Sequence, residues 1–234
     1  MSRFRALKEY GSYCHFVNLC NNGRMSSPAA AQPGLRERRR RETYLEFSNA
    51  AMDLFEQHGV HGTTVDDIAR RAGASPRTFF RYFATKEEAI FASADESEEF
   101  VRVAIAAIHG GEDTFRAIEA QWMLMLDDFD DRRDEHTRFL RIRRLIIGEP
   151  TLLAVALRRE AEQIDQLTEA AAQATDADPL TLRAGIATLA LAIRLTFDEW
   201  SRCAELGLNT PARTIYDEVR AGIADLTRRL GADR

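Results

Sequence analysis

The sequence predicts an all-α protein, and two observations support this fold class. From Leu35 onward, apolar residues recur at intervals of three and four, which is the spacing of one face of a helix. No window alternates apolar and polar residues strictly enough to indicate a β-strand. Because 45% of the 234 residues are hydrophobic, the chain can bury a substantial core in one or two domains.

The first 34 residues lack this periodicity. They contain an Asn-Asn-Gly stretch and a Ser, Ala, Gln and Pro-rich stretch, so residues 1–34 are predicted to be a flexible leader. Met25 offers a second start, and the first 24 residues need not belong to the working protein.

The first predicted helix carries Tyr44, Phe47, Ala51 and Leu54 on one side. It is expected to end at His58, because the glycine that follows can adopt the left-handed conformation of a C-terminal cap.

Two short helices are predicted next. Thr64 is a good N-cap for a helix over 65–72, and the two aspartates in its first turn complement the helix dipole. Gly73 ends that helix, and Ser75 followed by Pro76 is a favourable start for another over 77–83. A further helix is expected to begin near Thr85 and to run towards residue 92.

The remaining helices are longer and are separated by Gly, Pro and Asp-rich turns. We therefore predict a first domain over residues 35–92 and a second, entirely helical domain over residues 93–234. The predicted helices of the second domain cover residues 95–108, 113–129, 135–147, 151–174, 179–205 and 211–230.

The distribution of charge matters more than its total. A net charge of −5 would argue against nucleic-acid binding if the charge were evenly spread. However, residues 1–42 hold nine basic and three acidic side chains, whereas residues 93–234 hold 18 basic and 27 acidic ones. The densest basic run comprises Arg36, Arg38, Arg39, Arg40 and Arg41. This run is either a solvated tail or an arm that contacts the DNA backbone or minor groove.

The two short helices around Gly73 have the organisation of a helix-turn-helix, in which the second helix enters the major groove. Arg77, Thr78 and Arg81 supply hydrogen-bond donors to this second helix, and Phe79 and Phe83 are expected to form its buried side.

Residues 40–92 resemble the N-terminal domain of the tetracycline-repressor (TetR) family. The resemblance rests on TTV at 63–65, IA at 68–69, AGAS at 72–75 and TFFRYFATKE at 78–87. It implies a dimeric, ligand-responsive regulator of transcription, with a helical ligand-binding and dimerisation domain after the DNA-reading domain. It also implies a phosphate contact for Thr64, a groove-facing role for Arg77, Thr78, Phe80 and Arg81, and backbone phosphate contacts for Tyr82 and Lys86.

Two positions depart from the family pattern. Phe80 stands where tyrosine is common, and Pro76-Arg77 replaces a pair such as Lys-Gly. Arg77 is therefore the leading candidate for a bidentate contact with guanine.

The last two long helices carry apolar stripes that can pack against other helices. The resemblance implies that these helices form a homodimer interface, which would let two heads read a palindromic operator in double-stranded DNA. The candidate interface residues are Leu182, Ile186, Leu189, Ile193, Val219, Ile223 and Leu226.

A pocket for an effector is implied by the family and not by spacing. Bulky and flexible side chains suit an adaptable apolar pocket, although they suit an ordinary core equally well. The candidates are Trp122, Met125, Leu126, Phe129, Phe139, Ile142 and Phe197. Similarity to a branch with mycofactocin-associated and acyl-CoA-responsive repressors makes a lipophilic molecule, such as an acyl-CoA, the first expectation for the effector.

Other functions are less well supported. The sequence shows no nucleophile elbow, phosphate loop or metal-ligand motif, so neither an enzyme, a cofactor nor a metal site is expected. The acidic run over 127–135 lacks calcium-loop spacing and is interpreted as a solvated turn. A non-specific architectural DNA-binding protein remains an alternative, as does an all-helical enzyme. We expect a cytoplasmic protein, because no signal peptide or membrane-spanning apolar run is evident.

Overall fold

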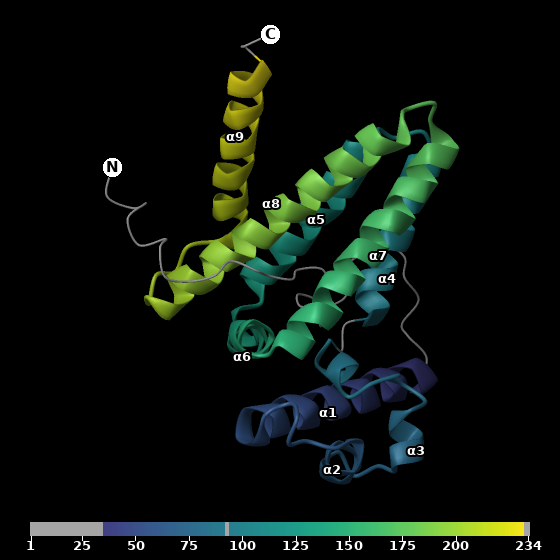
Figure 1. The fold of residues 1–234 in the computed structure, drawn as a ribbon, viewed down its shortest axis with the longest axis vertical. Coiled ribbons are helices and arrows are strands. Elements are labelled where there is room, and N and C mark those ends of the chain that lie inside the picture. Colours follow the sequence, from purple (N-terminus) through teal and green to yellow (C-terminus); the bar gives the residue numbers. More distant parts are fainter. Residues whose placement is uncertain (1–34, 92–93, 232–234) are drawn as a thin grey trace.

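The computed structural model describes residues 35–91 and 94–231, and this part of the chain is all-helical, as predicted (Figure 1). The predicted leader over residues 1–34 lies outside the described residues. We call residues 35–91 the head and residues 94–231 the body. One continuous apolar core runs through both parts, so the predicted domain boundary at residue 92 stays a proposal.

The head consists of a long helix that supports shorter ones. Its elements are α1 (Leu35–His58), α2 (Val65–Arg71), α3 (Pro76–Phe79) and the 3₁₀ helix η2 (Glu87–Ile90). α1 ends where the sequence predicted, and Gly59 follows it with a φ of 72° and its amide bonded to the Phe55 carbonyl.

The last two head helices are shorter than predicted. Regular α-helix in the second helix of the motif ends at Phe79 and does not reach residue 83. The amides of Arg81 and Tyr82 bond instead to carbonyls three residues earlier, which tightens the chain into a turn. The predicted helix after Thr85 is a single 3₁₀ turn for the same kind of reason, since the Ala89 amide bonds to the carbonyl of Lys86.

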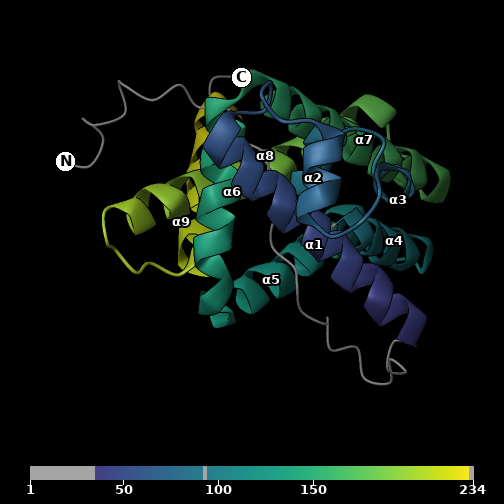
Figure 2. The same ribbon diagram turned by 90° about the horizontal axis from the view of Figure 1, so that it is seen from below.

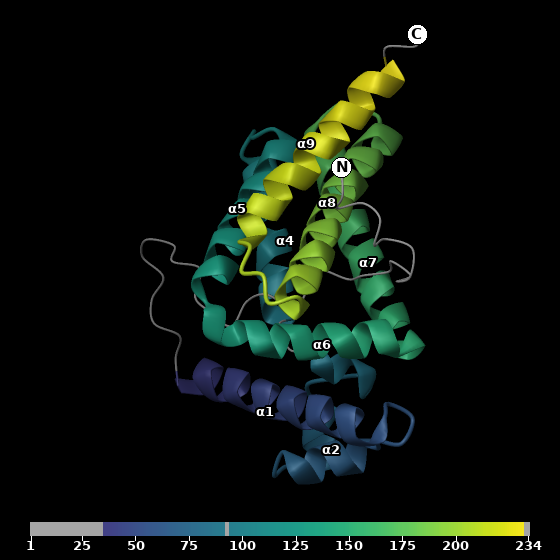
Figure 3. The ribbon, with the colours of Figure 1, turned by 90° about the vertical axis from the view of Figure 1, so that its left-hand side faces the viewer.

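The helices of the body agree with the prediction to within two residues at each end. They are α4 (Ala94–His109), α5 (Thr114–Asp131), η3 (Arg133–Glu135), α6 (His136–Gly148), α7 (Pro150–Ala174), α8 (Pro179–Glu205) and α9 (Ala212–Gly231). α7 packs against α4 and α8, and α9 packs against α8 and α5. Figure 3 shows α6 lying across the lower ends of the long helices, directly above α1.

The acidic run at the end of α5 has a structural role that the sequence did not predict. The Asp130 carboxylate accepts hydrogen bonds from the backbone amides of Ala212 (2.7 Å) and Arg213 (3.0 Å), and thereby caps the N-terminus of α9. Arg213 also pairs with Asp127 at 3.0 Å. These contacts tie the start of α9 to the end of α5, so Asp127 and Asp130 are not simply solvated.

α8 is long and apolar enough to cross a membrane by length and composition, which the sequence analysis did not recognise. Its contacts fit a core helix instead, because Ile193, Phe197 and Trp200 are buried inside the body. This feature is weak evidence for a membrane span.

α6 links the body to the head through arginines. On the body side, the buried Arg143 forms an ion pair with the half-buried Asp198 of α8. On the head side, Arg141 pairs with Glu56 at 2.5 Å and with Asp53 at 2.7 Å, both on α1.

Asp53 is the point where three helices meet, because its carboxylate also accepts a 2.8 Å hydrogen bond from Arg71 of α2. Partial burial raises the pKa of Asp53, but the hydrogen bonds from Arg141 and Arg71 outweigh it and hold the pKa below its ordinary value. The ionised carboxylate therefore orients α2 relative to both α1 and α6.

Replacement of Asp53 by Asn should make the free energy of unfolding less dependent on pH in the acidic range. A carboxylate with a lowered pKa stabilises the folded state above its unfolded pKa of about 4, and this contribution is lost as the pH falls through the lowered value. Asp53→Asn is expected to reduce the free energy of unfolding at pH 7 by about 1 to 2 kcal/mol. Urea titrations between pH 2 and 7 should then show a smaller acid-induced loss than in the wild type.

Asp165→Asn is the matched control, because Asp165 forms an exposed ion pair with Arg183 within the body. Exposed pairs contribute little to stability, so this variant should retain the wild-type profile. Equal profiles for both variants would show that Asp53 has no special role.

Candidate DNA interface

The first helix of the motif begins with a reciprocal cap. The Thr64 hydroxyl accepts from the Asp67 amide at 3.2 Å, and Asp67 accepts from the Thr64 amide at 3.1 Å. The hydroxyl also donates to Asp67 at 2.5 Å, and these hydrogen bonds lower the pKa of Asp67. The exposed Thr64 thus donates both its hydroxyl hydrogen and its amide hydrogen to Asp67 within the cap. A phosphate at this position would have to compete with Asp67 for these donors.

The turn between α2 and α3 uses residues that suit its geometry. Gly73 has a φ of 67°, a left-handed conformation that costs glycine little. Ser75 then caps α3 by accepting from the Thr78 amide at 3.1 Å, and Pro76 occupies the first helical position. The hydroxyls of Ser75 and Thr78 lie 2.9 Å apart in a further hydrogen bond.

An aromatic cluster fixes the orientation of α3. Phe79 is fully buried and its ring lies edge-on to Phe47 of α1 with centroids 5.3 Å apart. Phe83 is also buried, and its ring centroid lies 4.4 Å from that of Tyr44. The prediction that Phe79 and Phe83 form the buried side is confirmed.

The opposite side of α3 and the turn that follows it are open to solvent. Arg77 and Arg81 are exposed, and Phe80 is 59% exposed, which is unusual for so large an apolar side chain. Tyr82 is half-buried, with the Arg81 guanidinium 5.2 Å from its ring centroid. Figure 2, which views the molecule from the head side, shows α2 and α3 in front of the body helices.

Lys86 makes contacts that its predicted role did not include. Its ammonium donates to the backbone carbonyls of Val60 (2.6 Å) and Thr63 (2.8 Å), which belong to the turn before α2. The side chain is partly buried. Lys86 therefore holds the turn that leads into Thr64 and α2. Two of its three ammonium hydrogens are used in these bonds, so at most one remains for a phosphate.

The basic run lies in the first turns of α1. Arg39, Arg40 and Arg41 are exposed there, and the side chain of Arg38 lies outside the described part of the chain. The predicted DNA-arm role of these arginines stays a prediction.

Comparison with known proteins identifies this arrangement. The pattern of the family described as "Bacterial regulatory proteins, tetR family" matches residues 48–92, which covers the end of α1 and the whole motif. The chain is also 33% identical over 151 residues to the HTH-type transcriptional regulator TcmR of Streptomyces glaucescens, an alignment that spans 62% of this chain and 67% of TcmR. The chain belongs to the TetR family. It is a DNA-binding transcriptional regulator.

A second relative of this TetR-family regulator covers more of the chain. The protein from Mycobacterium tuberculosis named as a mycofactocin biosynthesis transcriptional regulator, MftR, is 28% identical over 196 residues, or 82% of this chain and 96% of MftR.

Solved structures with a similar fold include a TetR-family regulator from Mesorhizobium loti (TM-score 0.43, 18% identity, 78% of this chain and 96% of the other). Another is the fatty acid degradation regulator FadR from Bacillus halodurans (TM-score 0.40, 16% identity, 81% and 96%).

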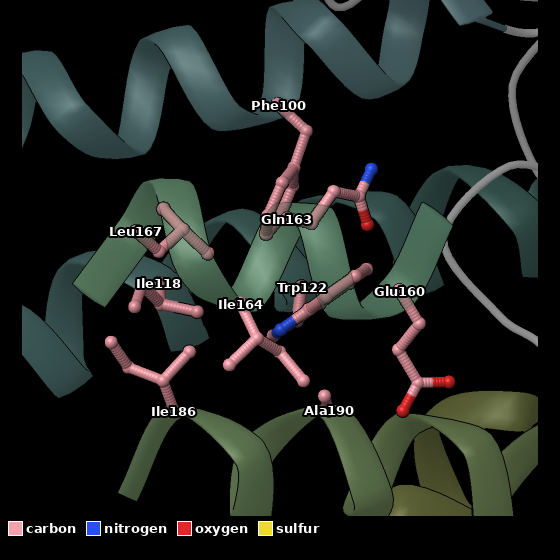
Figure 4. A pocket seen from close by; sticks show the side chains of 9 residues that line it. All are labelled: Phe100, Ile118, Trp122, Glu160, Gln163, Ile164, Leu167, Ile186 and Ala190. Atoms are coloured by element: carbon pink, nitrogen blue, oxygen red, sulfur yellow. The ribbon is translucent and has the colours of Figure 1, made fainter. Parts of the chain in front are cut away.

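The residues predicted to line an effector pocket are mostly packed core in this TetR-family regulator. Phe129, Phe139 and Phe197 surround one another and Trp200 with ring centroids 4.8 to 5.3 Å apart. Leu126 and Ile142 are completely buried, and Met125 is half-buried. Of the seven predicted residues, Trp122 lines a small cavity in the body (Figure 4).

The predicted dimer-interface residues divide into two groups. Leu182, Ile186 and Ile193 are at most 3% exposed within the single chain, so for these three the prediction is wrong. Their side of α8 already packs inside the body and is not available to a second copy. Leu189, Val219 and Ile223 are half-buried, and Leu226 is 56% exposed.

The sequence analysis missed the exposed leucines Leu191 and Leu195 on α8. Because α8 is apolar on several sides, its spacing alone could not show which side faces outward.

Arg77→Ala is expected to relax sequence preference at one base pair of the operator. An exposed arginine at the start of a recognition helix can read guanine with two hydrogen bonds, and such a contact contributes about 1 to 3 kcal/mol of discrimination. Fluorescence anisotropy with single-base operator variants would measure the change. Arg102→Ala, which removes an exposed arginine from α4, serves as the control. An unchanged preference in Arg77→Ala would show that Arg77 does not read a base.

Lys86→Met is expected to destabilise the protein as well as weaken DNA binding. The substitution removes two hydrogen bonds from a charged donor, and we expect a loss of about 1 to 3 kcal/mol in the free energy of unfolding in urea. Arg77→Ala should change that energy by less than about 0.5 kcal/mol, because Arg77 is exposed. If Lys86→Met is as stable as Arg77→Ala, the bonds to Val60 and Thr63 have no structural importance.

Proposed function

We propose that the protein is a repressor that binds a palindromic operator as a homodimer and is released from it by a lipophilic small molecule. The observation that carries the proposal is the outer side of α3 and of the turn after it, where Arg77, Phe80 and Arg81 are exposed while Phe79 anchors the helix from behind. Exposed arginines suit base edges and phosphates, and an exposed phenyl ring suits thymine methyl groups and sugars.

The C-terminal helices support the homodimer. α8 exposes Leu191 and Leu195 one turn apart, and α9 exposes Leu226 and Leu230 one turn apart. A pair of helices that leaves apolar stripes in solvent is suited to pack on the same pair of a second copy around a two-fold axis. Two heads related by that axis would read the two halves of a palindrome.

The charge distribution favours a specific regulator over an architectural DNA-binding protein. An architectural protein would be expected to carry a basic surface, whereas residues 93–234 hold 27 acidic and 18 basic side chains. Such a body should repel DNA. The affinity of the protein for DNA would then come from a few contacts made by the head. An operator on chromosomal DNA also places the proposed site of action in the cytoplasm.

The interior of the body bears on the effector. The apolar interior of the body suits a lipophilic effector, for which an acyl-CoA is the expectation from the resemblance. We propose no enzymatic activity, because TcmR and MftR are both named as transcriptional regulators.

The proposal is tested with DNA from upstream of the protein's own gene. We expect binding that is at least about 1,000-fold tighter than to a scrambled sequence at the same salt concentration, and a footprint with two-fold symmetry. Equal affinity for both DNAs would contradict specific regulation.

Leu226→Glu tests the proposed dimer. It should raise the dimer dissociation constant in sedimentation equilibrium and weaken operator binding at least ten-fold, because a charge would enter an apolar interface. Leu124→Glu on α5 is the matched control, since Leu124 is 54% exposed and Leu226 is 56% exposed. A Leu226→Glu protein that still sediments as a dimer would place the interface elsewhere.

A further inference from the structure

The body contains a small cavity where four of its helices meet. Phe100 of α4, Trp122 of α5, Glu160 and Gln163 of α7 and Ala190 of α8 line it together with aliphatic side chains (Figure 4). Its volume is about 10 Å³, which is room for one water molecule at most. An effector that enters here must therefore move the four helices apart. Binding at this position would thus change the arrangement of the helices in the body.

A hydrogen-bond donor in this cavity has no acceptor within the described part of the chain. Trp122 is 3% exposed, and its indole nitrogen makes no hydrogen bond there. Buried indole N–H groups normally have a partner, because an unpaired donor in an apolar site is unfavourable. The Phe100 ring lies against Trp122 with centroids 4.2 Å apart and holds the indole in place.

The polar groups of α7 lie on the other side of the indole. Figure 4 shows the Trp122 nitrogen on the side of Ile164, whereas the Glu160 carboxylate lies towards Ala190. Glu160 is 9% exposed and has Arg194 of α8 at 3.5 Å. A ligand between these groups would meet a donor at one end and a carboxylate acceptor at the other.

The lining also excludes a class of ligands. Among the residues that line the cavity, Glu160 carries the one formal charge, and no lysine, arginine or histidine is present. A carboxylate or phosphate placed there would be desolvated next to the negative charge of Glu160, and the neighbouring Arg194 already pairs with that carboxylate. The phosphates of an acyl-CoA would have to remain outside the body.

We propose that this cavity is the effector site and that it takes an uncharged, largely apolar molecule with a carbonyl oxygen for Trp122 and a hydroxyl group for Glu160. The class is that of neutral, largely apolar hydroxyketones. The inference rests on the proposed ligand-released regulator, and it narrows the effector from lipophilic molecules in general to neutral ones that both accept and donate a hydrogen bond.

The test pairs a change in the protein with a change in the ligand. The probe is 4-hydroxybenzophenone, and the matched compound is 4-benzylphenol, which has the same rings and hydroxyl but no carbonyl. Isothermal titration calorimetry at pH 6.5 should show that Trp122→Phe weakens the ketone about ten-fold and leaves 4-benzylphenol nearly unchanged. Trp200→Phe, which alters the other tryptophan in a cluster away from the cavity, should change neither affinity.

Three results would overturn the proposal. One is an equal loss of affinity for both compounds in Trp122→Phe, which would mean that only ring packing was lost. Another is tighter binding of decanoyl-CoA than of the ketone. The third is no binding of the ketone by the wild-type protein up to its limit of solubility.

Glu160→Gln provides a second variant if Trp122→Phe does not fold, since it keeps the shape of the side chain. It should weaken 4-hydroxybenzophenone several-fold and leave its methyl ether, 4-methoxybenzophenone, unaffected, because the ether has no hydroxyl to donate. Equal effects on both compounds would remove Glu160 from the site.

Binding and release are measured separately, so the two proposals can fail separately. If the ketone binds through Trp122 but leaves the operator complex intact in a gel shift, the site stands and ligand release fails. If another molecule releases the operator and Trp122→Phe responds to it like the wild type, ligand release stands and this site fails.

Discussion

The packing of Phe79 against Phe47 is the contact on which the DNA-reading surface depends. An α-helix of four residues does not form alone in water, because the first turn fixes several residues for a single hydrogen bond. α3 exists because its buried phenyl ring is surrounded by aromatic rings of α1 and of the turn that follows. The same anchoring decides which residues face outward: with Phe79 directed into the head, its neighbours Arg77, Phe80 and Arg81 stand in solvent.

The head is in turn oriented by charges and not by apolar packing alone. Asp53 accepts from Arg71 of α2 and from Arg141 of α6, while Lys86 holds the turn before α2 through two carbonyls. These contacts join segments that lie 18 to 88 residues apart in the sequence. The recognition elements therefore have a defined orientation relative to the body, which a regulator needs if events in the body are to alter DNA binding.

Local signals in the sequence predicted most of the fold. Helix boundaries are set by residues at the boundary itself, namely Gly59, Thr64, Ser75 and Pro76. The boundaries predicted from these residues agree with the structure. Interactions over long distances could not be predicted in this way. Nothing near Asp130 indicates that it caps α9, and nothing near Lys86 points to the carbonyls of Val60 and Thr63.

The candidate sites in the body were harder for the same reason. A helix such as α8, which has apolar residues on several sides, does not reveal which side is buried, so Ile186 was assigned to a partner when it faces the core. The pocket prediction relied on residue size, which cannot separate a tight aromatic cluster around Phe129 from the wall of a cavity. The signal that distinguishes Trp122 is an indole nitrogen without an acceptor among the residues that the structure describes, and this is visible only in three dimensions.

The cap that Asp130 provides couples the movement of α5 to that of α9. α5 carries Trp122 in its middle and Asp130 near its end, and that carboxylate holds the first two amides of α9. A tilt of α5 cannot occur without moving the start of α9 unless both hydrogen bonds break. In the proposed two-fold dimer, each copy would make the same movement with opposite direction. A displacement too small to detect within one subunit would thus be doubled in the distance between the two heads, and the fixed spacing of half-sites along DNA would convert it into a loss of fit.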